Sequence, residues 1–178
     1  MADRINLLGA SLVGAPEDKP GSAACGDIVI APMTAADLDR VLDIERASFG
    51  DPWSRAGFED CLEQPYAVML AARRQDRVIG YCCLYHMLDE GEIINVAIAP
   101  EERGQGVGLQ MLEALLKTGK ARGITRFLLD VRLSNTAAQR LYEKAGFMIL
   151  ARQKNFYQSP TEDAWLMELN VSDTSRQD

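Results

Sequence analysis

The residues whose types and spacing best suit a chemical task are Arg103-Gly104-Gln105-Gly106-Val107-Gly108, between a β-rich run and an apolar, helix-like run. Glycines let the backbone take positive φ angles and approach an anion closely. The N–H groups of a first helical turn lack helical partners, and the helix dipole adds partial positive charge, so a pyrophosphate fits there. A flexible loop with incidental glycines is the alternative. Because each glycine costs a helix about 1 kcal/mol relative to alanine, their accumulation at this helix start favours the phosphate-binding interpretation.

The spacing of the glycines narrows the class of nucleotide. A P-loop would end in Gly-Lys-Ser or Gly-Lys-Thr, which this segment lacks. A Rossmann dinucleotide loop needs Gly-x-Gly-x-x-Gly, and here the third glycine, Gly108, comes one residue too early. The pattern that is present is Arg-x-x-Gly-x-Gly, so neither of these two nucleotide loops accounts for it.

The elements around this loop predict an α+β fold in which one central mixed β-sheet is flanked by helices. Thr34, Ser54 and Asn135 are suited to cap the N-termini of helices, and Gly123 and Gly146 to end helices in the left-handed conformation. A fourth helix is expected to follow the glycine loop. Apolar periodicity and turn residues place the strands at residues 28–32, 66–73, 78–88, 92–99, 127–131, 147–154 and 164–169.

Length and composition indicate one globular domain. The chain has 178 residues, of which 47% are hydrophobic and 25% charged, an ordinary balance for a protein with a buried core. Residues 1–27 are rich in Gly, Ala, Pro and Ser and predict a flexible leader rather than a secretory signal. Residues 28–170 are predicted to form the folded domain, and residues 171–178 a polar tail. Since no stretch of about 18 apolar residues is present, no membrane partner is expected.

The cysteines and the net charge bear on location and partners. Cys25, Cys61, Cys82 and Cys83 form no Cys-x-x-Cys pair, so neither a disulfide framework nor a zinc site is expected, and a reducing cytoplasm is the natural location. The formal net charge of -7 disfavours nucleic acid as a partner and is compatible with a cationic substrate. His86 is the single histidine, and a structural role is expected for it rather than metal binding.

Together with the order of the elements, Arg-x-x-Gly-x-Gly resembles the acetyl-CoA pyrophosphate loop of the GNAT superfamily of N-acetyltransferases. The resemblance spans about residues 28–169. It implies a GNAT-like acyl-CoA N-acyltransferase fold, acetyl-CoA as co-substrate and no metal. The coenzyme contacts that it implies in this loop involve Arg103, Gly104, Gln105, Gly106, Val107 and Gly108.

Within that superfamily the chain resembles the RimI family, whose members acetylate the N-terminal alanine of a ribosomal small-subunit protein. The likeness lies in a loop between two helices, the central strand, the approach to the last helix, that helix itself and a C-terminal hairpin. These segments are residues 49–54, 95–100, 129–135, 141–147, and 155–157 with 162–164. The resemblance implies that the acceptor is the N-terminal α-amine of a protein.

The same resemblance assigns candidate catalytic residues. It places Tyr142 beside the thioester sulfur as the general acid that protonates the leaving thiolate. Tyr142 also lies on the apolar stripe of its helix, and a core role can coexist with the catalytic one. RimI-like enzymes carry glutamate at the position of Asp130, where aspartate is one methylene shorter and could act through a bridging water. Glu92, which begins the central strand, is an equal candidate for the base, and a water chain without a dedicated base is the third possibility.

Coenzyme contacts beyond the glycine loop are also implied by the resemblance. The backbone of Val96, Ala97 and Ile98 is expected to polarise the thioester carbonyl and to pair with pantetheine, if this strand splays away from its neighbour. Asn135 is expected to contact coenzyme A in addition to capping its helix, although capping alone would explain this residue.

The acceptor side is less sharply defined by the sequence. Trp53 and Tyr157 could line a peptide groove or simply cover the core. Glu59, Asp60 and Glu63 form an acidic group that is either a solvated helix face or a contact for a basic N-terminal peptide. The leading hypothesis is acetylation of a protein N-terminus. The alternatives are a GNAT acetyltransferase of a small-molecule amine and a non-catalytic acyl-CoA-binding regulatory module.

Overall fold

The structure, a computed structural model, describes residues 27–171 as one mixed seven-stranded sheet with four α-helices, which confirms the predicted fold class. Only Asp27 and Val171 of the predicted leader and tail belong to the described residues, and Cys25 lies outside them. The strand order is β1-β2-β3-β4-β5-β7-β6, and β4–β5 is the parallel pair among otherwise antiparallel neighbours. The strands are β1 (Ile28–Pro32), β2 (Ala67–Arg74), β3 (Arg77–Met87), β4 (Glu90–Ile98), β5 (Arg126–Arg132), β6 (Met148–Gln158) and β7 (Thr161–Asn170).

The helices begin and end largely where the sequence predicts. The Ser54 hydroxyl accepts the Gly57 N–H at 3.1 Å, and the Asn135 side chain accepts the Ala138 N–H at 3.1 Å, so both predicted caps are confirmed. Thr34 is also an N-cap residue, but of a 3-10 turn (Ala35–Asp37) that leads directly into the first α-helix. The helices are α1 (Leu38–Ser48), α2 (Arg55–Leu62), α3 (Val107–Ala121) and α4 (Thr136–Lys144). None of the helices in residues 27–171 is long and apolar enough to cross a membrane.

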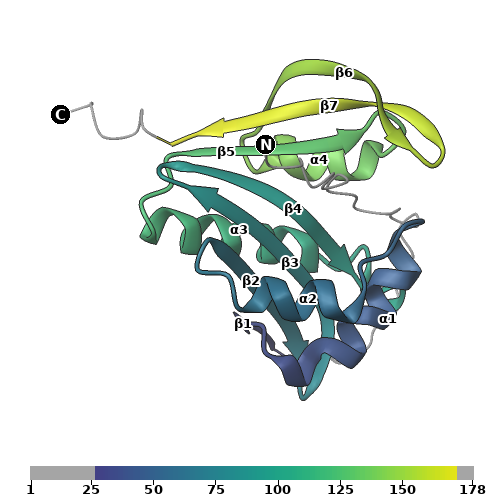
Figure 1. The fold of residues 1–178 in the computed structure, drawn as a ribbon, viewed down its shortest axis with the longest axis vertical. Coiled ribbons are helices and arrows are strands. Elements are labelled where there is room, and N and C mark those ends of the chain that lie inside the picture. Colours follow the sequence, from purple (N-terminus) through teal and green to yellow (C-terminus); the bar gives the residue numbers. More distant parts are fainter. Residues whose placement is uncertain (1–26, 172–178) are drawn as a thin grey trace.

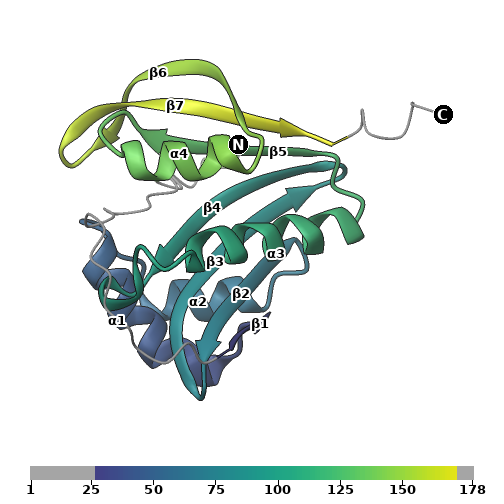
Figure 2. The same ribbon diagram turned by 180° about the vertical axis from the view of Figure 1, so that it is seen from behind.

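Helices cover both faces of the sheet. In Figure 1, α1 and α2 lie on the near face of β2, β3 and β4, and Figure 2 shows α3 and α4 on the opposite face. Each face has its own apolar core. The neighbouring residues Cys82 and Cys83 of β3 belong to different cores, the first to the α3–α4 side and the second to the α1–α2 side. The two thiols therefore point to opposite faces of the sheet.

The sheet divides into two arms between β4 and β5. Their pairing is confined to the register Glu90↔Arg126 through Glu92↔Leu128, and beyond it the two strands diverge (Figure 1). A register shift where β4 passes Cys83 and Leu84 of β3 adds local twist at this point. β4 therefore continues with the N-terminal arm, while β5, β7 and β6 form the C-terminal arm.

Two features of the C-terminal arm bear on the site. β5 is not buried on both faces: Phe127, Leu129 and Val131 are buried, while the residues between them are half-buried. One face of β5 is therefore open to carry polar groups. β6 extends to Gln158 rather than ending at residue 154, and it contains an irregularity around Asn155, whose φ is +51°.

Candidate active site

The glycine loop forms the N-terminus of α3. Gly104 and Gly106 have φ angles of +75° and +79°, and Gly106 is the N-cap residue, without a side-chain cap. Val107 and Gly108, predicted as loop, already belong to the first helical turn. Among residues 27–171, a Cβ atom on Gly106 would meet no heavy atom within 4 Å, so these residues leave the space over this backbone open. The unpaired N–H groups at the start of a 15-residue helix are therefore approachable by an anion.

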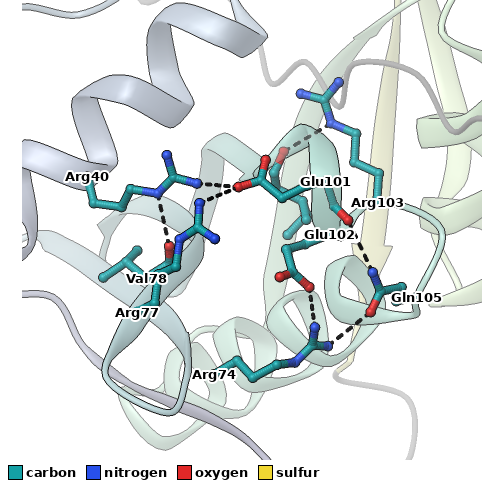
Figure 3. Close-up of polar contacts among 9 residues, drawn as sticks. Arg40, Arg74, Arg77, Val78, Glu101, Glu102, Arg103 and Gln105 are labelled. Atoms are coloured by element: carbon teal, nitrogen blue, oxygen red, sulfur yellow. Dashed lines mark hydrogen bonds and ion pairs between the residues drawn. The ribbon is translucent and has the colours of Figure 1, made fainter. Parts of the chain in front are cut away.

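The acidic residues that precede the loop are neutralised by arginines (Figure 3). Glu101 accepts from Arg40 and Arg77, at 2.6 Å each, and Glu102 pairs with Arg74. Three guanidinium groups thus face two carboxylates beside the loop. Although the net charge of the chain is -7, this corner is locally positive, as phosphate binding requires.

The two long side chains of the loop make hydrogen bonds within the protein. Arg103 donates from Nε to the Ile98 carbonyl at 3.0 Å and from Nη2 to the Ser48 hydroxyl at 3.1 Å (Figure 3 shows the first contact). The exposed Gln105 donates to the Glu101 carbonyl at 3.2 Å. Since both side chains are engaged, the backbone is the part of the loop that is suited to contact an anion.

The splayed part of β4 has backbone groups that face the gap between the arms. Ala99 donates its N–H to the Ile79 carbonyl of β3 at 2.8 Å, and antiparallel strands alternate between bonded and non-bonded pairs. The backbone groups of Ala97 accordingly point to β3, and those of Val96 and Ile98 point the other way, toward the diverging β5. Of the three residues predicted for pantetheine binding, Val96 and Ile98 have the suitable orientation.

The two candidate bases lie on one face of the sheet beside the split. Glu92 is the last β4 residue paired with β5, opposite Leu128, and Asp130 lies two residues further along β5 on the same face. Burial raises the pKa of Asp130 to about 6, the charge of Glu92 adds to this increase, and a hydrogen bond from Gln153 opposes it. Partial removal of water from around its carboxyl also raises the pKa of Glu92, although the residue as a whole is exposed. The structure thus brings both carboxyls together.

Tyr142 comes from the opposite face, on α4. Its side chain is fully buried, and its hydroxyl has no hydrogen-bond partner within residues 27–171. Burial raises its pKa, as do the neighbouring Tyr157 and Cys82. The ring packs on Phe147 with a centroid distance of 5.9 Å. A buried hydroxyl without a partner is costly, so within residues 27–171 the Tyr142 hydroxyl is a hydrogen-bond donor that no other group uses.

The two aromatic residues predicted at the acceptor side are packed into the protein. Tyr157 is 3% exposed, and its hydroxyl donates to the backbone carbonyl of Asp130 at 3.3 Å, while the Arg132 guanidinium stacks on its ring at 3.9 Å. Trp53 is half-buried against Phe58, with 5.3 Å between the ring centroids. Tyr157 therefore packs directly beside Asp130.

A buried polar network escaped the sequence analysis. The Glu45 carboxylate of α1 is 1% exposed and accepts the Trp53 N–H at 2.9 Å and the Tyr81 hydroxyl. Asn95 of β4 in turn donates to that hydroxyl at 3.1 Å. The network ties the connection between α1 and α2 to the centre of the sheet. Its signal in the sequence is a charged residue on an apolar stripe, seven residues after Leu38.

The other predicted features remain on the surface. Glu59, Asp60 and Glu63 are exposed, and Glu59 lies 3.6 Å from Arg55. His86 is half-buried, with its Nε2 at 3.4 Å from an Arg122 nitrogen. Among residues 27–171, no group of three or more His, Cys, Asp or Glu side chains could hold a metal ion.

A mixed sheet whose central parallel pair diverges beside a glycine-capped helix is the fold of the GNAT acyltransferases. Residues 38–147 match the model of the acetyltransferase (GNAT) family, and the chain belongs to this family.

The relatives within this family narrow the comparison. The chain is 34% identical over 144 residues to a ribosomal protein bS18 alanine N-acetyltransferase of Haemophilus ducreyi, over 79% of this chain and 99% of the relative. A Bacillus subtilis protein that carries the same description provisionally is 36% identical over 142 residues, covering 79% and 94%. The crystal structure of the ribosomal-protein-S18-alanine N-acetyltransferase from Escherichia coli superposes with a TM-score of 0.76 at 28% identity, covering 85% and 98%.

Proposed function

We propose that this protein transfers the acetyl group of acetyl-CoA to the N-terminal α-amine of a protein, and that the acceptor is the N-terminal alanine of ribosomal small-subunit protein bS18. The observation that carries the transfer chemistry is the buried hydroxyl of Tyr142, which has no hydrogen-bond partner within residues 27–171 and lies near Tyr157 and Cys82. The choice of acceptor is supported by the relatives that act on this alanine. Residues 28–170 would form the transferase domain, flanked by a leader and a tail, and the enzyme would act in the cytoplasm.

Binding of the coenzyme would rest on backbone groups. The open N-terminus of α3 would hold the pyrophosphate, with Gly104 and Gly106 supplying the positive φ angles that the loop requires. The N–H groups of Val96 and Ile98 would hold the pantetheine arm and polarise the thioester carbonyl. A donor of this kind contributes about 2.7–4 kcal/mol to transition-state stabilisation. Asn135, which caps α4, would contribute a further contact to the coenzyme.

The proton transfers would use groups from both faces of the sheet. Tyr142 would donate its hydroxyl proton to the departing thiolate, and its raised pKa keeps that proton in place until the thiolate forms. Asp130 would take the proton that the amine loses. With a pKa of about 6, the Asp130 carboxyl is mostly ionised at pH 8 and still basic enough to accept a proton. Glu92 is the second candidate for this step, because it lies on the same face.

The test is acetyl transfer from acetyl-CoA at pH 8 to four acceptors. They are a basic peptide beginning with alanine, the same peptide with a blocked N-terminus, a peptide whose only free amine is a lysine side chain, and spermidine. We expect turnover confined to the free alanine terminus, and its loss in Tyr142→Phe with retained coenzyme A binding. Turnover on spermidine alone would overturn the acceptor assignment. No turnover on any amine, with coenzyme A still bound, would indicate a binding module instead.

A further inference from the structure

Gln153 of β6 reaches across a whole strand to the candidate base. Its amide nitrogen donates a hydrogen bond to Oδ1 of Asp130, although β7 lies between β5 and β6. Asp130 pairs with Leu166 and Gln153 with Ala164, so the two polar side chains lie on one face, offset by two residues along β7. The hydrogen bond therefore crosses β7 diagonally, between Leu166, opposite Asp130, and Ala164, opposite Gln153.

The position of Gln153 in β6 is fixed by the irregularity that follows it. Regular pairing with β7 stops at Gln153 and resumes at Tyr157. Within this interval the Asn155 N–H donates to Asp163 at 2.8 Å, and Arg152, on the other side of Gln153, donates to the same carboxylate at 2.7 Å. Asp163 therefore accepts hydrogen bonds from residues on both sides of Gln153. These bonds fix the position of Gln153 in β6.

The groups around Asp130 determine how much this hydrogen bond affects the ionisation of its carboxyl. Burial and the facing carboxylate of Glu92, from β4, both favour the protonated form of Asp130. From β6, Tyr157 donates to the backbone carbonyl of Asp130 and not to its carboxylate. Arg132, on the same strand, is engaged with Glu162 at 3.1 Å. Among these neighbours, Gln153 is the group that donates to the carboxylate and so favours its ionised form.

We propose that Gln153 is a positioning residue for the acetyl transfer: it keeps Asp130 ionised and fixed beside the split, where Asp130 accepts the proton of the acceptor amine. This inference rests on the proposed function and selects Asp130, rather than Glu92, as the base. In this step the amine nitrogen bonds to the acetyl carbon, the carbon–sulfur bond of the thioester breaks, the Asp130 carboxylate takes up the proton that the amine loses, and Tyr142 protonates the departing thiolate. Gln153 itself forms and breaks no covalent bond.

The experiment compares three single variants of the full-length protein. Gln153→Leu removes the donor, and Gln153→Lys replaces it with a cation. Gln158→Leu is the matched control, because Gln158 lies on the same strand and donates to the Asn155 carbonyl instead. Two quantities are measured: the pH dependence of kcat/KM with the alanine-starting peptide, and the pKa of Asp130 from carbon NMR of labelled aspartate. The NMR titration needs no turnover and therefore does not depend on the proposed function.

We expect the pKa of Asp130 and the acid limb of kcat/KM to rise together by about 0.5–1 pH unit in Gln153→Leu. This corresponds to a loss of roughly three- to tenfold in kcat/KM below the limb. Gln153→Lys should return both to the wild-type position or below it, and Gln158→Leu should leave both unchanged. An unmoved pKa in Gln153→Leu would overturn the inference. A moved pKa with an unmoved acid limb would also overturn it, because Asp130 would not be the base. An inactive wild-type protein would instead count against the proposed function.

Discussion

Replacing Asp130 with asparagine should make the protein more stable and much less active. Asparagine has nearly the same shape, and its carbonyl can still accept the Gln153 amide, so the change removes little besides the charge. If Asp130 is the base, kcat should fall by about 10²–10⁴-fold, the usual contribution of general base catalysis. The stability gain follows from the raised pKa, because a carboxyl that is reluctant to ionise in the folded state weakens folding at neutral pH.

The size of this gain can be worked from the pKa. The Asp130 pKa rises from 3.8 to about 6 on folding, and each pH unit corresponds to about 1.4 kcal/mol. The product, roughly 3 kcal/mol, is an upper bound, since the carboxyl is only half-buried and partly screened by solvent. We therefore expect Asp130→Asn to raise the free energy of unfolding by about 1 kcal/mol at pH 7.5 and the Tm by about 2–4 °C.

The sign of the pH dependence provides the sharper test. Because the folded-state pKa is above the unfolded one, the folded wild-type protein binds the extra proton between about pH 4 and pH 6. The contribution of Asp130 to the free energy of unfolding is fully present below about pH 4 and is lost as the pH rises through about 6. The advantage of Asp130→Asn should thus be near zero at pH 4 and full at pH 7.5, as measured by urea unfolding. A variant less stable than wild type at pH 7.5, or an advantage independent of pH, would refute the reasoning.

Three further substitutions probe the other parts of the site. Tyr142→Phe removes the proposed general acid, so kcat should fall by about 10²–10⁴-fold. Because the lost hydroxyl has no hydrogen-bond partner within residues 27–171, the Tm should stay equal or rise, and a large loss of Tm would contradict this. Gly106→Ala imposes the positive φ on a Cβ-bearing residue, so KM for acetyl-CoA should rise with stability lowered by about 1 kcal/mol; an unchanged KM would count against the phosphate site. Glu45→Gln leaves the Trp53 N–H or the Tyr81 hydroxyl unpaired and should cost about 1–3 kcal/mol in urea unfolding.

Local chemistry explains why most of the fold could be predicted. Ser54 and Asn135 cap their helices through bonds to residues three positions away, and Gly123 and Gly146 have φ angles of +87° and +96°, as expected of helix-ending glycines. Such contacts depend only on neighbours in the chain, so sequence patterns report them directly. The glycine loop was predictable for the same reason, because Gly106 and the helix that it begins are adjacent in sequence.

The chemistry of the site depends on contacts between distant segments, which no local pattern contains. Glu92 and Asp130 become neighbours because β4 pairs with β5 for three residues and then diverges. Gln153 meets Asp130 across β7 because the strand register puts both side chains on one face, and Glu45 is buried because Tyr81 and the Trp53 backbone satisfy its carboxylate. The sequence by itself determined the elements, the position of the glycine loop and the candidate acid and bases. Only tertiary packing decided which side chains surround the candidate acid and bases and shift their pKa values, because these values depend on burial and on charges brought together by folding.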